Sequence, residues 1–131
     1  EEGMKLLKNS IEIKTSKCNT VKEKIKAIIL IQIKGIIKYE NLLSIVFSQI
    51  LGNEPRNQLC KDKVQEYVDV IERVIKDGIE NQEMRKCNSK LMAYTIFSLT
   101  SSLMMYKNQT KKEYSILELY RECETIIFGQ I

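Results

Sequence analysis

The sequence contains no histidine and is poor in glycine (5) and proline (1). Without histidine, the 131-residue chain lacks both the commonest general base and the commonest metal ligand. A β-rich domain of this length usually needs more turn residues than these few can supply. These shortages favour an all-α fold and disfavour histidine-dependent catalysis and metal binding.

The cysteines are too widely spaced for a zinc site or a redox motif, both of which favour close pairs. They stand at Cys18, Cys60, Cys87 and Cys123. No glycine-rich phosphate-binding loop is present, and no histidine can activate Cys123 as a nucleophile. We expect Glu118, Glu122 and Glu124 to lie on a solvated helix surface. The sequence therefore predicts a reduced, non-enzymatic protein without metal ion or cofactor.

No apolar run is long enough to cross a membrane. The densest run, residues 27–33, is interrupted by Gln32 and is far shorter than the ~20 apolar residues that a transmembrane helix needs. The chain opens with two glutamates and no signal peptide, so we expect a cytoplasmic location. The net charge of +4 comes from scattered lysines and is weak for a nucleic-acid binder. The missing initiator methionine suggests a piece of a longer protein.

Residues 20–38 are predicted to form the central helix. Thr20 and Glu23 have the spacing of a capping box, in which the Thr hydroxyl accepts from the Glu amide and the Glu carboxylate reaches back to the Thr amide. The buried surface is assigned to Ile25, Ile28, Ile29, Ile33 and Ile36. A strand is the competing interpretation, because isoleucine-rich segments favour β structure. The length and the cap favour a helix that is buried on nearly every side.

Five more helices are predicted, giving helices over residues 1–14, 20–38, 42–51, 56–81, 89–107 and 111–131. The pattern is clearest in residues 56–81, where a stripe recurs at spacings of three and four: Cys60, Val64, Tyr67, Ile71, Val74 and Gly78. Gly52, Asn53 and Pro55 predict a stop before this helix. No linker divides the chain, so we expect one domain over residues 1–131.

The last two predicted helices have wide apolar surfaces. Apolar and small residues cover more than one face of residues 89–107, so one face can pack on the core while another needs a partner. The small side chains of Ser98, Ser101 and Ser102 would allow another helix to approach closely. A protein–protein contact is therefore expected from the pattern alone.

Four stretches resemble the C-terminal regulatory domain of the TetR/AcrR family of transcriptional regulators. Residues 1–7 (EEGMKLL) are similar to the helix that leaves the DNA-binding head, and residues 20–27 (TVKEKIKA) to the capped start of the next helix. Residues 74–85 (VIKDGIENQEMR) resemble a common family segment, although Gln82 stands where glycine is usual. Residues 92–103 resemble the interface helix. The family's helix-turn-helix head is absent from the sequence.

The resemblance implies a homodimeric sensor of a small, often apolar effector. The last two of its six helices would form an intersubunit four-helix bundle, and ligand binding would be coupled to operator DNA through the head missing here. The expected interface residues are Tyr94, Ser98, Ser101, Ser102, Met105, Ile116, Tyr120, Cys123 and Ile127. The alternative is a stand-alone helical domain that binds another protein through its exposed stripe.

The candidate effector-binding residues are Met4, Leu7, Ile11, Gln32, Phe47, Tyr67 and Met92. Gln32 is the most informative of them, because a buried amide needs hydrogen-bond partners, supplied by a ligand, a neighbouring side chain or water. Aromatic walls with a few polar groups are usual in ligand sites, which favours Tyr67 and Phe47. Core packing is the competing role for each of these aromatic side chains.

Overall fold

A computed structural model of the chain describes residues 2–110, 113 and 115–128, except for the side chains of Glu2 and Leu42. These residues form α1 (Glu2–Ser16), α2 (Val21–Ile50), the short 3₁₀ helix η1 (Pro55–Asn57), α3 (Gln58–Glu80), α4 (Ser89–Thr110) and α5 (Ile116–Phe128). No strand occurs in this described part, so the predicted all-α fold is confirmed. Nor does any of its helices have the length and apolar character that crossing a membrane requires.

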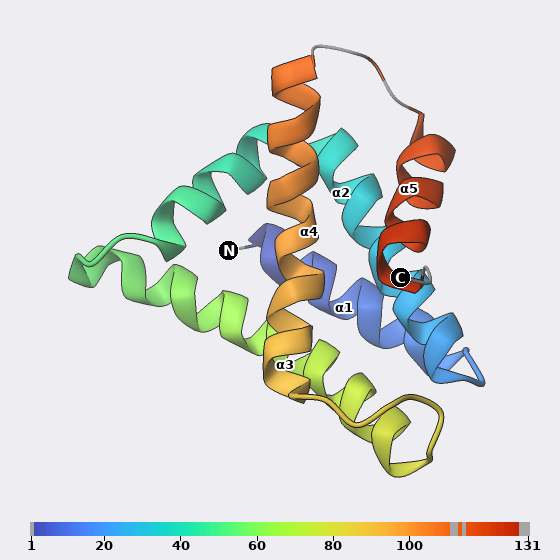
Figure 1. Cartoon of the computed structure of the whole chain (residues 1–131). Coiled ribbons are helices and arrows are strands. Elements are labelled where there is room, and N and C mark those ends of the chain that lie inside the picture. Colours follow the sequence, from blue (N-terminus) through green and yellow to red (C-terminus); the bar gives the residue numbers. More distant parts are fainter. Residues whose placement is uncertain (1, 111–112, 114, 129–131) are drawn as a thin grey trace.

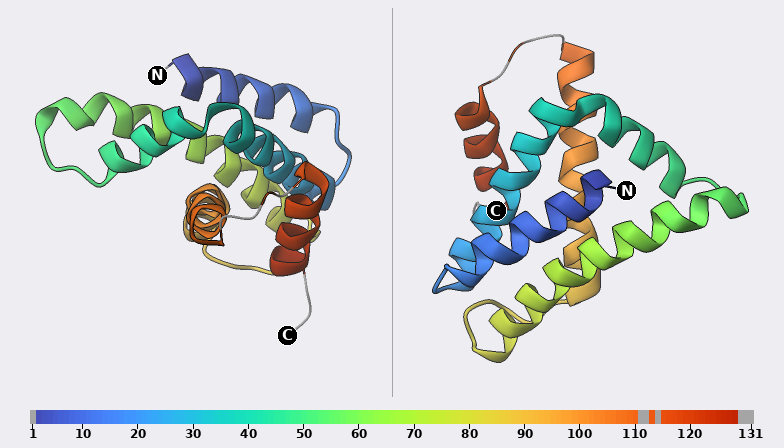
Figure 2. Two further views of the ribbon diagram at one scale, coloured as in Figure 1. Left: turned by 90° about the horizontal axis from the view of Figure 1, so that it is seen from above. Right: turned by 180° about the vertical axis from the view of Figure 1, so that it is seen from behind.

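The helices form three layers (Figure 1). Seen from above in Figure 2, α1 lies on one side of α2 and α3, while α4 and α5 lie on the opposite side. α1 and α4 each contact both middle helices, and α5 packs on α2. Because α2 is covered on both sides, its first half must be apolar nearly all round.

The isoleucines of α2 form the centre of the core. The predicted set is buried as expected, with exposed fractions of 0–4%: Ile25, Ile28, Ile29, Ile33 and Ile36. Each such side chain stabilises the fold by about 1.5–3 kcal/mol relative to leaving it in water. Thr20 Oγ1 accepts from the Glu23 amide at 3.1 Å, as predicted. The reciprocal contact differs, because the Glu23 carboxylate accepts from the Thr20 hydroxyl at 3.1 Å and not from the Thr20 amide.

α2 is kinked at Tyr39, whose backbone angles (φ −130°, ψ 36°) are not helical. The predicted break at residues 39–41 is real. However, the predicted helices over residues 20–38 and 42–51 are the two halves of one bent helix, with no loop between them (Figure 1). The bend lets the second half turn back, so that Val46 and Phe47 pack against the main core.

The predicted stripe of α3 is buried in full, and Val68, Val70 and Ile75 widen it. α3 ends in a Schellman motif: the Glu83 amide donates to the Gly78 carbonyl at 2.8 Å, and the Gln82 amide donates to the Ile79 carbonyl at 3.1 Å. Gln82 adopts a φ of 59°, in the left-handed region that favours glycine. Gln82 therefore forms this turn at the position where glycine is usual, and its backbone is strained there.

The last helix begins later than predicted. Of the residues before it, Glu113 and Ser115 are not helical, and α5 starts at Ile116. Ser115 caps it, because its hydroxyl accepts from the Glu118 amide at 3.1 Å. The predicted start at Lys111 and the predicted end at Ile131 both lie outside the described residues, as does Glu1 in the first predicted helix.

Candidate functional site

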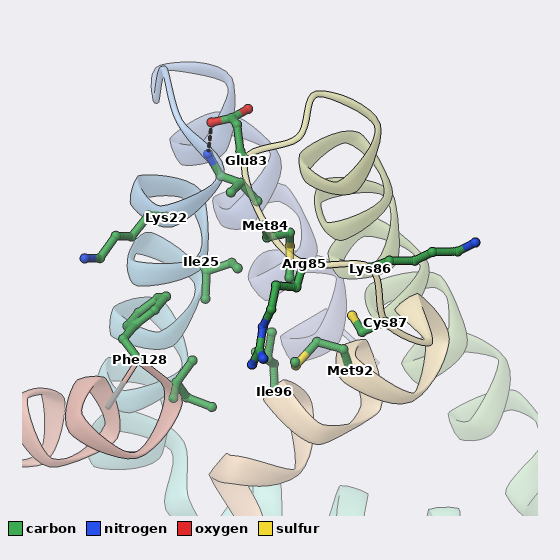
Figure 3. Close-up of a pocket in the computed structure, with 12 residues that line it drawn as sticks. Lys22, Ile25, Glu83, Met84, Arg85, Lys86, Cys87, Met92, Ile96 and Phe128 are labelled. Atoms are coloured by element: carbon green, nitrogen blue, oxygen red, sulfur yellow. Dashed lines mark hydrogen bonds between the residues drawn. The ribbon is translucent and has the colours of Figure 1, made fainter. Parts of the chain in front are cut away.

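A pocket of about 880 Å³ opens between the start of α2, the α3–α4 connection, the start of α4 and the end of α5 (Figure 3). Its volume lies within the range of about 300–1,000 Å³ that is usual for small-molecule sites. Its wall is largely apolar and consists of Val21, Ile25, Met84, Met92, Ile96, Ile127 and Phe128. Such a wall can enclose an aliphatic or aromatic ligand, and the two methionines can adapt their side chains to its shape.

The polar residues that line the pocket are Lys22, Glu83, Arg85, Lys86 and Cys87. Glu83 stabilises the start of α2, because its Oε1 accepts a hydrogen bond from the Val21 backbone amide at 2.9 Å. This amide has no partner within the helix. The same hydrogen bond links the α3–α4 connection to α2. Gly78 permits it, since a Cβ at this position would lie 2.5 Å from Val21 Cγ2.

A family profile described as "Tetracyclin repressor-like, C-terminal domain" matches residues 18–105, which is more than half of the chain. The chain belongs to this family. Within the described residues, the helical architecture agrees with the TetR-like domain that the sequence pattern predicted. No curated protein matches the sequence.

Among solved structures, the chain is similar to a Clostridium perfringens "putative fatty acid metabolism regulator". The two share 24% sequence identity with a TM-score of 0.91, over 99% of this chain and 71% of that chain. At this identity the likeness shows the fold, here the fold of a TetR-family C-terminal domain.

Gln32 and Tyr67 lie next to each other in the core of this TetR-like domain. The Tyr67 hydroxyl donates to Gln32 Oε1 at 2.7 Å, and Gln32 Nε2 donates to the Ile96 carbonyl at 2.8 Å. Burial raises the pKa of Tyr67 well above its ordinary value, so its hydroxyl stays protonated and can donate. Because Ile96 lines the pocket, this polar pair stands directly behind the pocket wall.

The other predicted effector residues are divided between several places. Phe47 packs against Phe97, with ring centroids 5.1 Å apart, in the core. Ile11 is fully buried on α1. Met4 and Leu7 line a second cavity of about 10 Å³, roughly the space of one water molecule. Of the predicted set, only Met92 lines the 880 Å³ pocket.

The expected interface residues of α4 lie on its outer side. Tyr94 is 36% exposed and Met105 is 64% exposed, while Ser98 and Ser102 are exposed and Ser101 is half-buried. The buried side of the same helix consists of Ala93, Ile96, Phe97, Thr100 and Met104. The helix thus has one face packed on the core of the chain and one exposed face.

The expected interface stripe of α5 needs a correction at Cys123, which has no exposed surface and belongs to the core of the protomer. Ile116, Tyr120 and Ile127 are half-buried against the same core. The apolar side chains that α5 exposes are instead Leu117 (55%) and Ile126 (66%). A fully buried side chain has no exposed area with which to contact a partner. The apolar stripe of α5 packs against α2 of the same chain.

The cysteines remain thiols in the structure. Burial, with a smaller contribution from Glu122, raises the pKa of Cys123 from 9.0 to about 11. Its thiol is therefore protonated at neutral pH and is a poor nucleophile. Among the described residues, no group of three or more cysteine, aspartate or glutamate side chains could hold a metal ion.

Sequence reasoning missed most of the pocket, in particular Arg85 and Phe128. Residues 81–88 contain five charged or sulfur-containing side chains in a row after Gln82, and the polarity of the segment suggested only a loop. Their proximity to α5 depends on tertiary packing. The one available signal was Met84, a large apolar residue inside an otherwise polar connection.

Proposed function

We propose that this chain is the effector-binding and dimerisation domain of a TetR-like transcriptional regulator, with the 880 Å³ pocket as its effector site. The observation that carries this proposal is a largely apolar pocket inside a domain of this family. The domain would act without catalysis, in the cytoplasm, and would influence operator DNA through a separate DNA-binding head. The name of the Clostridium perfringens relative, a regulator of fatty acid metabolism, supports an aliphatic effector.

The packing supports a physical connection from the pocket to α1. Val21 and Ile25 of α2 line the pocket, and so does Ile96 of α4. The Ile96 carbonyl accepts a hydrogen bond from Gln32 of α2, which in turn accepts one from Tyr67 of α3. α1 packs on the other side of α2 and α3. An effector that changes the position of α2 or α3 would therefore displace α1, the helix expected to meet the DNA-binding head.

Gln32, Tyr67 and Phe47 would then act behind the pocket wall, and Met92 would contact the effector. Met4, Leu7 and Ile11 would respond on the α1 side. The described cavity at Met4 and Leu7 is too small for an effector.

The effector site is tested by filling the pocket. Met92→Trp should weaken binding of Nile red, a neutral apolar dye whose fluorescence rises in apolar surroundings, because the larger indole would take up part of the pocket and displace a bound dye. Leu91→Trp is the matched control, since Leu91 is 63% exposed and does not line the pocket. Circular dichroism would verify that both variants fold. Equal dye binding by wild type and Met92→Trp would exclude this pocket as the site and favour the alternative, a domain that binds another protein through its exposed apolar residues.

A further inference from the structure

Arg85 differs from the other basic residues at the pocket. Figure 3 shows its guanidinium pointing into the pocket, whereas the side chains of Lys22 and Lys86 extend away from it on opposite sides. Arg85 forms no hydrogen bond or ion pair with any residue that the structure describes. An arginine has five N–H donors and a permanent charge, and Arg85 is an exposed residue, so its guanidinium is free of partners among the described residues and open to an anion that displaces water.

The acidic residue of the pocket does not neutralise Arg85. Glu83 is the only acid in the described pocket lining, and one of its carboxylate oxygens accepts from the Val21 amide. In Figure 3 this carboxylate lies at the opposite end of the pocket from the guanidinium. Glu83 and Thr20 accept from the Val21 and Glu23 amides at the start of α2, and Arg85 is the charged donor whose side chain points into the pocket in Figure 3.

The wall that faces Arg85 is aliphatic and aromatic. Met92, Ile96 and Ile127 supply aliphatic surface, and Phe128 supplies a ring with the Lys22 ammonium 5.5 Å from its centroid. Lys26 is 6.0 Å from the same ring and forms an ion pair with Glu124 at 3.5 Å. The two lysines add positive potential near the α5 side of the pocket without pairing with its interior.

From this arrangement we propose that the pocket selects amphipathic anions, namely aliphatic carboxylates, with Arg85 binding the carboxylate and the apolar wall enclosing the chain. The inference rests on the proposed effector-binding function and specifies the chemical class of the effector. Arginine matches a carboxylate with two parallel N–H donors, and a hydrogen bond between charged groups is stronger than one between neutral groups. A neutral alcohol of equal chain length would bury the same apolar area but would leave the guanidinium without its anion.

The test compares decanoate with 1-decanol by calorimetric titration at pH 7, in wild type, Arg85→Met and Lys90→Met. Decanoate should bind wild type up to about fivefold more tightly than decanol, the range expected for an ion pair at an exposed arginine. Arg85→Met should remove this preference and leave decanol binding unchanged. Lys90→Met removes the same charge from an exposed position of α4 that does not line the pocket, and should keep the preference.

Shortening the ligand gives a second measurement. Each methylene removed from decanoate should weaken binding about fourfold if the chain is enclosed by the apolar wall. Equal affinity for decanoate and decanol in wild type would overturn the anion selectivity while leaving an effector pocket intact. A preference that survives in Arg85→Met would overturn the role of Arg85. Failure of both amphiphiles to bind would overturn the ligand class, and the Nile red comparison would then decide the proposed function separately.

Discussion

At the scale of single residues, the buried contact between Gln32 and Tyr67 is the most specific polar feature of the core. Gln32 is 4% exposed and Tyr67 is fully buried. The sequence could indicate that Gln32 needs a partner, because the residues around it are apolar. It could not identify Tyr67, which is 35 positions away, or the Ile96 carbonyl, because those contacts exist only once α2, α3 and α4 have packed.

Replacing one member of this pair should destabilise the fold more than replacing both. Gln32→Met leaves the Tyr67 hydroxyl buried without an acceptor and should lower the free energy of unfolding by about 1–3 kcal/mol. Gln32→Met combined with Tyr67→Phe removes both polar groups and should recover most of this loss. Urea unfolding of the two single variants and the double variant measures the coupling. Additive losses would contradict the paired arrangement.

At the scale of helices, the sequence predicted the elements better than their ends. The isoleucines of residues 20–38 and the stripe of residues 56–81 have clear helical spacing, so these helices could be predicted. The start of α5 could have been found, because Ser115 and Glu118 stand at capping-box spacing. The sequence did not show that two predicted helices form the single helix α2. The chain is kinked at Tyr39 but is helical on both sides of the kink, with no loop between the halves.

The turn after α3 supplies a prediction at this scale. Gln82→Gly should raise the free energy of unfolding by about 1 kcal/mol, because Gln82 has a φ of 59° and an L-residue in this conformation is strained by about 1–2 kcal/mol. Asn81→Gly is the matched control: Asn81 has a φ of −85°, so glycine would relieve no backbone strain at this position. Thermal unfolding of both variants provides the comparison. A lower stability of Gln82→Gly would show that the glutamine side chain stabilises the turn more than its backbone strains it.

At the scale of the whole molecule, the layers explain why most of the predicted effector residues lie in the core and not in the pocket. It selected the most apolar and aromatic positions, and in a three-layer helical domain these fill the core. The pocket instead forms where the ends of α2, α4 and α5 meet the α3–α4 connection (Figure 3). Spacing within a single helix contains no information about such a meeting point, so of the predicted set only Met92 belongs to it.

The outer side of α4 supplies a prediction about assembly. If this face forms the proposed dimer, Ser98→Arg should give monomers in light scattering, because a long charged side chain would stand where two helices approach closely. Ser44→Arg, at an exposed position of α2, is the control and should leave the mass unchanged. A Ser98→Arg protein with the mass of a dimer would place the interface on another surface.

The central claim is that the effector binds in the pocket at the end of the bundle, and the five methionines allow it to be tested directly. Met84 and Met92 line the pocket, Met4 lines the small cavity near α1, and Met104 and Met105 lie on the second half of α4. The measurement is methyl NMR of methionine-labelled protein titrated with decanoate and, separately, with 1-decanol. We expect the largest shifts at Met84 and Met92. Shifts largest at Met4, Met104 or Met105 would contradict the account.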